Sequence, residues 1–502
     1  MKSKKLFSLL IFFSCLLLFH SLSWAQYFDA MKAQVQEHSL ANGMKFIVLE
    51  RHEAPVASFH VYADVGSANE TYGITGISHL LEHMAFKGTK TVGTKNFEAE
   101  RDIIAKMDPL YDKIIFEQNK VNPDTLVLKK MKAELEELRK QEKEQVINNE
   151  YFDMMMQQGD AGVNAYTSND ATQYINSLPS NKVEFWMSMT SDRFMNPVFR
   201  EFYKEKDVVM EERRLGLETR PIGKLFEDFV AAAFKAHPYH HSVVGHMSDL
   251  ERITRQNVVD YFQKYYQPSN LTVAIVGDVD AQEVFNMAQL YFGRIASGPK
   301  PEPVRTVEPE QWGERHVDVT AKSQPILLIG YHRPAETSED NAALEALANI
   351  IGQGRSCRLW ELLVKDKKAA AATGSFNGWP GSKFPNLIAF YALSAKDHSS
   401  AECLELIDQE IEKIKQESVT AAELTKFKQS QKKGIIDGMK SNSSMAATLT
   451  YYDVVHGSWA KAFDQIKEVD KITADDVKRV ANKYLVIKNR TVGEIIPEVE
   501  VK

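Results

Sequence analysis

Two histidines four residues apart, His79 and His83, form the most distinctive chemical pattern of the chain, and Glu82 directly precedes the second in "GISHLLEHMAFKGT". On an α-helix, residues i and i+4 lie on one face, so both imidazoles can bind one metal ion with Glu82 nearby. Zinc lowers the pKa of a bound water, and Glu82 can then accept its proton as the water attacks a carbonyl. With 14 histidines, chance produces this pattern in roughly one such chain in twenty. A plain amphipathic helix therefore stays open as the alternative.

A catalytic zinc ion also needs a third protein ligand and an open fourth position, so the surrounding sequence decides the interpretation. Four stretches resemble one family, in the family's own order: "DVGSANE…GISHLLEHMAFKGT", "NAYTSNDATQYI" (164–175), "EKDVVMEERR" (205–214) and "YYQPSNLTVAIVGDVD" (265–280). They are similar to the pitrilysin-type zinc peptidases, which carry the inverted zincin motif HxxEH, and especially to the branch of mitochondrial processing peptidase.

The resemblance implies roles for further residues. Glu212 matches the third zinc ligand of the family, and Glu205 matches an acid that orients a ligand histidine by hydrogen bonding. Asn164 and Ala165 match a strand whose edge holds the substrate backbone by β-augmentation. We interpret Thr167, in the same stretch, as structural.

The second half departs from the family pattern. Active members place an arginine and a tyrosine seven residues apart there, in contact with substrate near the zinc. Alignment of "SCRLWELLVKDKKAAAATGSF" puts Val364 and Ala371 at those positions. Neither side chain can donate a hydrogen bond to a tetrahedral oxyanion. We therefore expect a zinc-bearing subunit of a heterodimer, whose homologous non-zinc partner supplies the Arg/Tyr pair, or else a homodimer.

An internal repeat predicts two homologous domains. Residues 253–273 align without gaps to residues 472–492 with eight identities, and both read as a helix, a turn and a β-branched strand. A Pro- and Glu-rich linker at 296–314 separates a zinc-binding domain at 26–295 from a homologous domain at 315–502. Strand-like runs precede helical segments in both halves. This order predicts an α+β fold, each domain being a mainly antiparallel sheet packed with helices.

The first half contains an insertion, at about 101–158, that is charged and favours helix. Asn122-Pro123-Asp124 interrupts it, and Asp124 can cap a second helix, which predicts a helical hairpin. Two interpretations stay open: a solvated protrusion, or an arm that docks a partner.

The N-terminus has the features of an export signal. Three lysines precede a short apolar run, and Ser23 and Ala25 form a small-residue cleavage pair, so residues 1–25 read as a signal peptide. An uncleaved membrane anchor is the alternative. The later sequence contains no span of bilayer length, and we expect a periplasmic or secreted protein. After removal of the signal peptide only Cys357 and Cys403 remain, and these are too few to stabilise domains of this size by disulfide bonds.

Together these patterns predict a zinc-dependent endopeptidase that hydrolyses peptides or small unfolded proteins. A formal charge of −7 without a basic stripe argues against nucleic acid as a partner. The alternative function is a non-catalytic structural or peptide-binding subunit of the same fold. A second histidine group at 236–246 fits no zinc pattern, and we expect no metal there.

Overall fold

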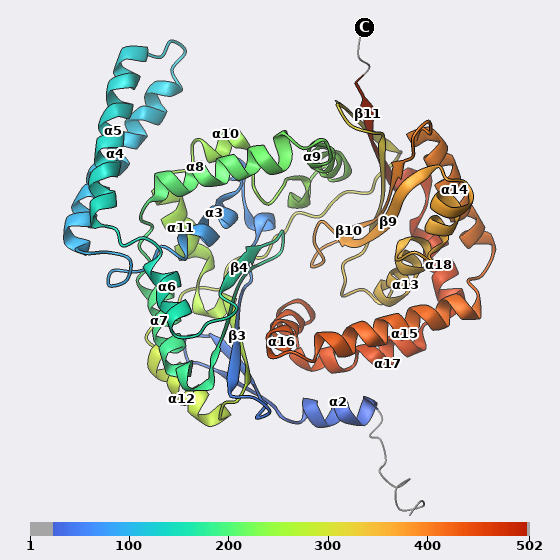
Figure 1. The fold of residues 1–502 in the computed structure, drawn as a ribbon, viewed down its shortest axis with the longest axis horizontal. Coiled ribbons are helices and arrows are strands. Elements are labelled where there is room, and N and C mark those ends of the chain that lie inside the picture. The colour runs from blue at the N-terminus through green and yellow to red at the C-terminus, as the bar shows by residue number, and fades with distance from the viewer. Residues whose placement is uncertain (1–23, 499–502) are drawn as a thin grey trace, which may run out of the picture.

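The computed structural model describes residues 24–498, which fold into two lobes, each built on one β-sheet (Figure 1). The predicted signal peptide lies outside the described residues, except for the two that begin helix α2 (Trp24–Lys32). Within the described part of the chain, no helix is both long and apolar enough to span a bilayer.

The first lobe is built on a six-stranded sheet. Its strands, in spatial order, are β1 (Val35–Ser39), β2 (Lys45–Glu50), β6 (Leu271–Gly277), β3 (Val56–Ala63), β5 (Thr172–Pro179) and β4 (Asn164–Thr167). Only β2 and β6 run parallel. The order leaves β4 at the edge of the sheet, with one side of its backbone unpaired within the sheet.

The second lobe repeats this plan with five strands. They are, in spatial order, β7 (Arg315–Ala321), β11 (Arg490–Pro497), β8 (Ile326–Arg333), β10 (Asn386–Ser394) and β9 (Ala370–Trp379), and only β7 and β11 are parallel. The sequence repeat falls on equivalent elements: Asn270 and Asn489, which precede β6 and β11, donate side-chain hydrogen bonds to the carbonyls of Tyr265 and Tyr484. The predicted α+β fold with two homologous, mainly antiparallel domains is confirmed.

Helices cover both sheets (Figure 1). After α2, the first half of the chain contains the helices α3 (Ile77–Met84), α4 (Phe97–Gln118), α5 (Thr125–Gln145), α6 (Glu150–Gln157), α7 (Val183–Met195), α8 (Phe202–Arg213), α9 (Pro221–Ala233), α10 (Met247–Leu250), α11 (Arg255–Tyr265) and α12 (Ala281–Tyr291). The second half contains α13 (Asn341–Gly352), α14 (Ser400–Gln416), α15 (Ala421–Gly438), α16 (Asn442–His456), α17 (Gln465–Lys471) and α18 (Ala474–Tyr484).

Two helices pack across the lobes. Helix α9 of the first half lies on β7 and β11, where Phe229 joins the apolar cluster of the second sheet. Helix α16 of the second half lies on β3 and β6, where Leu449 joins a cluster of the first sheet. A buried hydrogen bond of 2.8 Å between Thr450 Oγ1 and His60 Nδ1 accompanies this packing. Each sheet therefore buries one face against a helix from the other half of the chain, which joins the lobes firmly.

The stretch between α12 and β7 contains no helix or strand among the elements of the described chain. We propose that residues 296–314 form the linker between the lobes, with 26–295 and 315–502 as the two domains.

The insertion forms a helical hairpin of α4 and α5 that projects away from the first lobe (Figure 1). Asp124 caps α5 as expected, since its carboxylate accepts hydrogen bonds from the amides of Leu126 (2.9 Å) and Val127 (3.1 Å). The first helix begins at Phe97, slightly before the predicted start of the insertion.

Candidate metal centre

Helix α3 carries the HxxEH motif and is held by its apolar side, because Ile77, Leu80 and Met84 are buried. The buried carboxylate of Glu70 accepts hydrogen bonds of 2.8 Å from the amides of Gly76 and Ser78, at the helix start. These bonds satisfy backbone donors that an α-helix leaves free at its N-terminus. Sequence reasoning missed Glu70, which lies within the "DVGSANE" stretch. The motif is thus presented on a firmly seated helix.

Three side chains converge at one point beside α3. Glu212 Oε2, on α8, lies 3.6 Å from Nε2 of His79 and 3.6 Å from Nε2 of His83. Within the described residues, this is the one group of three potential ligands whose donor atoms all lie within 4.8 Å of one another. Two ligands of a tetrahedral zinc ion lie about 3.3 Å apart, so these separations suit zinc. Burial lowers the pKa of His79 to about 4, which keeps its imidazole neutral, as metal binding requires. The donor set therefore fits zinc.

Glu205, the residue that the resemblance assigns to the orientation of a ligand histidine, lies beside His83. Its Oε2 is 3.6 Å from Nδ1 of His83, and its Oε1 is 2.6 Å from the Lys87 ammonium. Burial raises the pKa of Glu205, but the contacts with His83 and Lys87 outweigh it and bring that pKa to about 2. An ionised Glu205 favours the imidazole orientation in which Nδ1 carries the proton and Nε2 faces Glu212.

Glu82 lies on the same helix and contacts strand β4. Its Oε2 accepts a hydrogen bond of 2.6 Å from Thr167 Oγ1. Burial raises the pKa of Glu82, and the hydrogen bond from Thr167 opposes that rise. Asn164 and Ala165 lie on the same edge strand. The structure therefore gives Thr167, which sequence reasoning treated as structural, a direct contact with the candidate base.

The second lobe holds the turn that follows β4. The carboxylate of Asp170 accepts hydrogen bonds from the amides of Ser382 (2.7 Å) and Lys383 (3.1 Å), and another from the Tyr239 hydroxyl. Lys383 also forms an ion pair with Asp64. The position of Thr167 is thereby tied to the loop between β9 and β10 of the other lobe.

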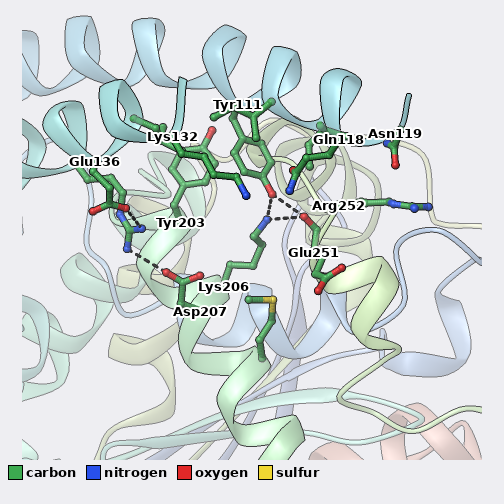
Figure 2. A pocket seen from close by; sticks show the side chains of 15 residues that line it. Tyr111, Gln118, Asn119, Lys132, Glu136, Tyr203, Lys206, Asp207, Glu251 and Arg252 are labelled. Atoms are coloured by element: carbon green, nitrogen blue, oxygen red, sulfur yellow. Dashed lines mark hydrogen bonds and ion pairs between the residues drawn. The ribbon is translucent and has the colours of Figure 1, made fainter. Parts of the chain in front are cut away.

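Helix α8 separates the metal centre from the hairpin. Glu205 and Glu212 face α3, whereas Lys206 points to the hairpin side, where its ammonium contacts the Tyr111 hydroxyl and, at 3.0 Å, the carbonyl oxygen of Glu251 (Figure 2). Burial lowers the pKa of Lys206 to about 7. A cavity of about 640 Å³ lies here between α4, α5 and α8. None of the candidate metal ligands lines this cavity. Its lining combines residues of the hairpin with residues of α8.

The positions predicted to lack arginine and tyrosine lie in the second lobe. Val364 is half-buried in a π-helical turn (Trp360–Asp366), and Ala371 lies on β9. Among the described residues, no side chain of the second lobe forms a hydrogen bond or ion pair with the HxxEH residues or Glu212. All three candidate metal ligands lie on the first lobe.

The histidines of 236–246 have other partners. His237 accepts a hydrogen bond from the amide of Tyr239, and His240 bonds to Tyr72. In the part of the chain that the structure describes, they form no group with ligand atoms close enough to share an ion.

Comparison with known families agrees with this geometry. The model described as "Insulinase (Peptidase family M16)" matches residues 45–105, which include α3, and the model "Peptidase M16 inactive domain" matches residues 252–431. All three candidate ligands lie outside the second match. Both halves of the chain therefore match models of the M16 family of peptidases, the pitrilysin-type family.

Similar proteins extend over nearly the whole chain. "Zinc protease PqqE" of Helicobacter pylori is 28% identical over 455 residues, covering 89% of both chains. A "Probable mitochondrial-processing peptidase subunit beta" of Arabidopsis thaliana is 22% identical, covering 91% of this chain and 78% of its own. The crystal structure of a protease from Helicobacter pylori matches with a TM-score of 0.77 and 26% identity, covering 92% of this chain and 99% of the other.

Proposed function

We propose that this protein is a zinc-dependent endopeptidase acting on peptides or small unfolded proteins. The observation that carries the proposal is the convergence of His79, His83 and Glu212 beside the half-buried carboxylate of Glu82. The similarity to proteins named zinc proteases supports it.

Each candidate residue would have a separate role in hydrolysis. His79, His83 and Glu212 would hold the zinc ion, and Glu205 would orient His83. When bound, zinc would supply a Lewis acid that polarises a peptide carbonyl and favours deprotonation of water. Glu82 would accept the proton of the attacking water and then pass it to the leaving amine. Thr167 binds one oxygen of Glu82, which leaves the other for the proton.

Strand β4 is the proposed substrate-binding edge. Asn164 and Ala165 are on the outermost strand of the sheet, which brings Thr167 at its end against Glu82. A peptide that adds to this edge as a further strand would lie next to the candidate base. An extended backbone is required for such pairing, which favours unfolded substrates.

The second half of the site would come from another subunit. Val364 and Ala371 cannot stabilise an oxyanion, and the second lobe, as far as residue 498, offers no side-chain hydrogen bond to the motif residues. We infer a heterodimer with a homologous non-zinc subunit that supplies an arginine and a tyrosine, or else a homodimer. Export to the periplasm, or secretion, belongs to the same proposal.

Two matched measurements test the proposal. Zinc content is measured for wild type and for the Glu212→Gln variant, which should bind zinc more weakly. Cleavage of a quenched peptide library is then compared for the chain alone, for the chain mixed with a homologous partner, and for the Val364→Arg/Ala371→Tyr variant. We expect cleavage to rise with the partner. Turnover by the single chain equal to that of the complex would rule out the need for a partner.

A peptide-binding or structural role is the second candidate. The family description "inactive domain" for 252–431, together with Val364 and Ala371, favours it. Zinc binding without cleavage under every condition above would select this role.

A further inference from the structure

The tip of the hairpin exposes an unusual concentration of apolar side chains. Phe116 is 71% exposed, Val121 97%, Leu126 79% and Val127 42%. These four residues lie within a stretch of twelve, yet they make up a quarter of the sixteen exposed large hydrophobic residues of the described chain. Exposed apolar groups that cluster in this way mark an interaction site more often than singly scattered ones do.

Unpaired positive charge surrounds this tip. Lys113, Lys129 and Lys130 are exposed, and among the described residues none has a carboxylate within 4 Å. A fourth lysine, Lys120, pairs with Glu117.

The two acidic residues of the tip, Glu117 and Asp124, form their contacts within the hairpin. Glu117 binds Lys120 and accepts a hydrogen bond from the amide of Asp124, while Asp124 caps α5. The tip is therefore basic on a chain whose formal charge is −7.

The tip lies beyond the contacts that anchor the hairpin to the rest of the first lobe (Figure 1). The base of the hairpin is held to α8 and to the residue after α10: Tyr111 donates to the carbonyl of Glu251 (2.6 Å), as Figure 2 shows, and Arg139 pairs with Asp207 (3.1 Å). The side-chain hydrogen bonds and ion pairs of residues 113–130, in contrast, all stay inside the hairpin. Tyr111 lies seven residues before Gln118, the last residue of α4, so the tip extends about 10 Å along the helix beyond this anchor.

We propose that this tip, residues 113–130, docks the protein on an anionic lipid surface. Lysines around exposed Phe, Leu and Val side chains are typical of segments that insert apolar groups at a membrane interface and bind anionic headgroups. Protein interfaces are instead depleted in lysine and enriched in arginine and tyrosine. Docking is independent of the proposed peptidase activity.

A fluorescent reporter at the tip tests the proposal on the full chain. Val121→Cys carries an environment-sensitive dye, and Ile487→Cys, 64% exposed on the second lobe, is the matched control. Cys357 and Cys403 are buried, and the wild-type chain labelled in parallel defines the background. The probe surfaces are phosphatidylcholine vesicles with or without about 30 mol% phosphatidylglycerol.

We expect a blue shift from position 121, but not 487, with the anionic vesicles only. Lys129→Glu/Lys130→Glu should weaken this binding at least about 10-fold. Lys367→Glu/Lys396→Glu, the same charge change at exposed lysines of the second lobe, should not.

Three results would overturn the proposal. One is an unchanged spectrum at position 121 with anionic vesicles. Another is equal weakening by both charge variants, which would mean general attraction. The third is a shift that grows with protein concentration without lipid, which would assign the tip to a second copy of the chain.

Discussion

Thr167 Oγ1 lies 2.6 Å from Glu82 Oε2, so the strand proposed to bind substrate and the helix proposed to bind zinc meet at the candidate base. The hydroxyl is itself positioned by a turn whose Asp170 is bound by backbone amides of the second lobe. The orientation of Glu82 therefore depends on both lobes, although all candidate ligands lie on one.

Removing this hydroxyl should slow the chemical step. A hydrogen bond to a charged group is worth about 1.5–3 kcal/mol, so we expect Thr167→Val to lower kcat about 10-fold or more with KM and zinc content little changed. Thr167→Ser keeps the donor and should restore most of the loss. Wild-type kcat in Thr167→Val would show that the contact has no role in turnover.

Glu205 should control zinc affinity rather than the chemical step. Partners that orient a ligand histidine typically contribute 10- to 100-fold to metal affinity, and we expect a loss of about that size in Glu205→Gln. Competition with a chelator measures it. Glu211→Gln is the matched control, because Glu211 is on the same helix but pairs with Arg214 at the surface. Equal affinities of the two variants would contradict the assignment.

The sequence predicted those parts of the site that depend on local spacing or on a resembling motif. His79, Glu82 and His83 share a face because the helical period requires it, and the resemblance pointed to Glu212 and Glu205. The sequence did not reveal the role of Thr167. Its contact with Glu82 depends on the pairing of β4 with β5 and on the position of this edge of the sheet relative to α3. The packing of α9 and α16 across the lobes was missed for a similar reason. An amphipathic helix shows that one face is buried, but not which sheet buries it.

A buried ion pair should stabilise the loop that follows α3. Arg200 Nε lies 2.7 Å from Glu100 Oε1, both side chains are at most 1% exposed, and Arg200 also donates to the carbonyls of Thr89 and Val92. Glu100→Gln would leave a buried charge without its partner, which costs about 3–5 kcal/mol of unfolding free energy. Denaturant unfolding measures this.

The control for this pair is Glu98→Gln on the same helix. Glu98 is 68% exposed and pairs with Arg101, so its loss should cost less than about 1 kcal/mol. Similar unfolding free energies for the Glu100 and Glu98 variants would refute the stabilising role of the buried pair.

The packing of α16 on the first sheet should make stability depend on pH through His60. Burial lowers the pKa of His60 to about 4, below the 6.5 of an unfolded histidine. Between pH 4 and pH 6.5, the unfolded chain therefore binds a proton at His60 and the folded chain does not. The stability contribution is complete above pH 6.5 and is lost as pH falls toward 4, by up to about 3 kcal/mol.

Replacing His60 by asparagine isolates this effect. The variant keeps an acceptor for Thr450 but cannot titrate, so its unfolding free energy should fall less steeply than that of wild type between pH 6.5 and 4. Parallel pH dependences for the two proteins would exclude His60 as a source of acid sensitivity.

The most direct test of the central claim compares wild type with Glu82→Gln, in the assembly that cleaves peptides best. Zinc content and hydrolysis of a quenched peptide library are measured on the same samples. The assignment of Glu82 as the base predicts unchanged zinc content and cleavage reduced by about 10²- to 10⁴-fold. Equal cleavage by the two proteins at equal zinc content would contradict it.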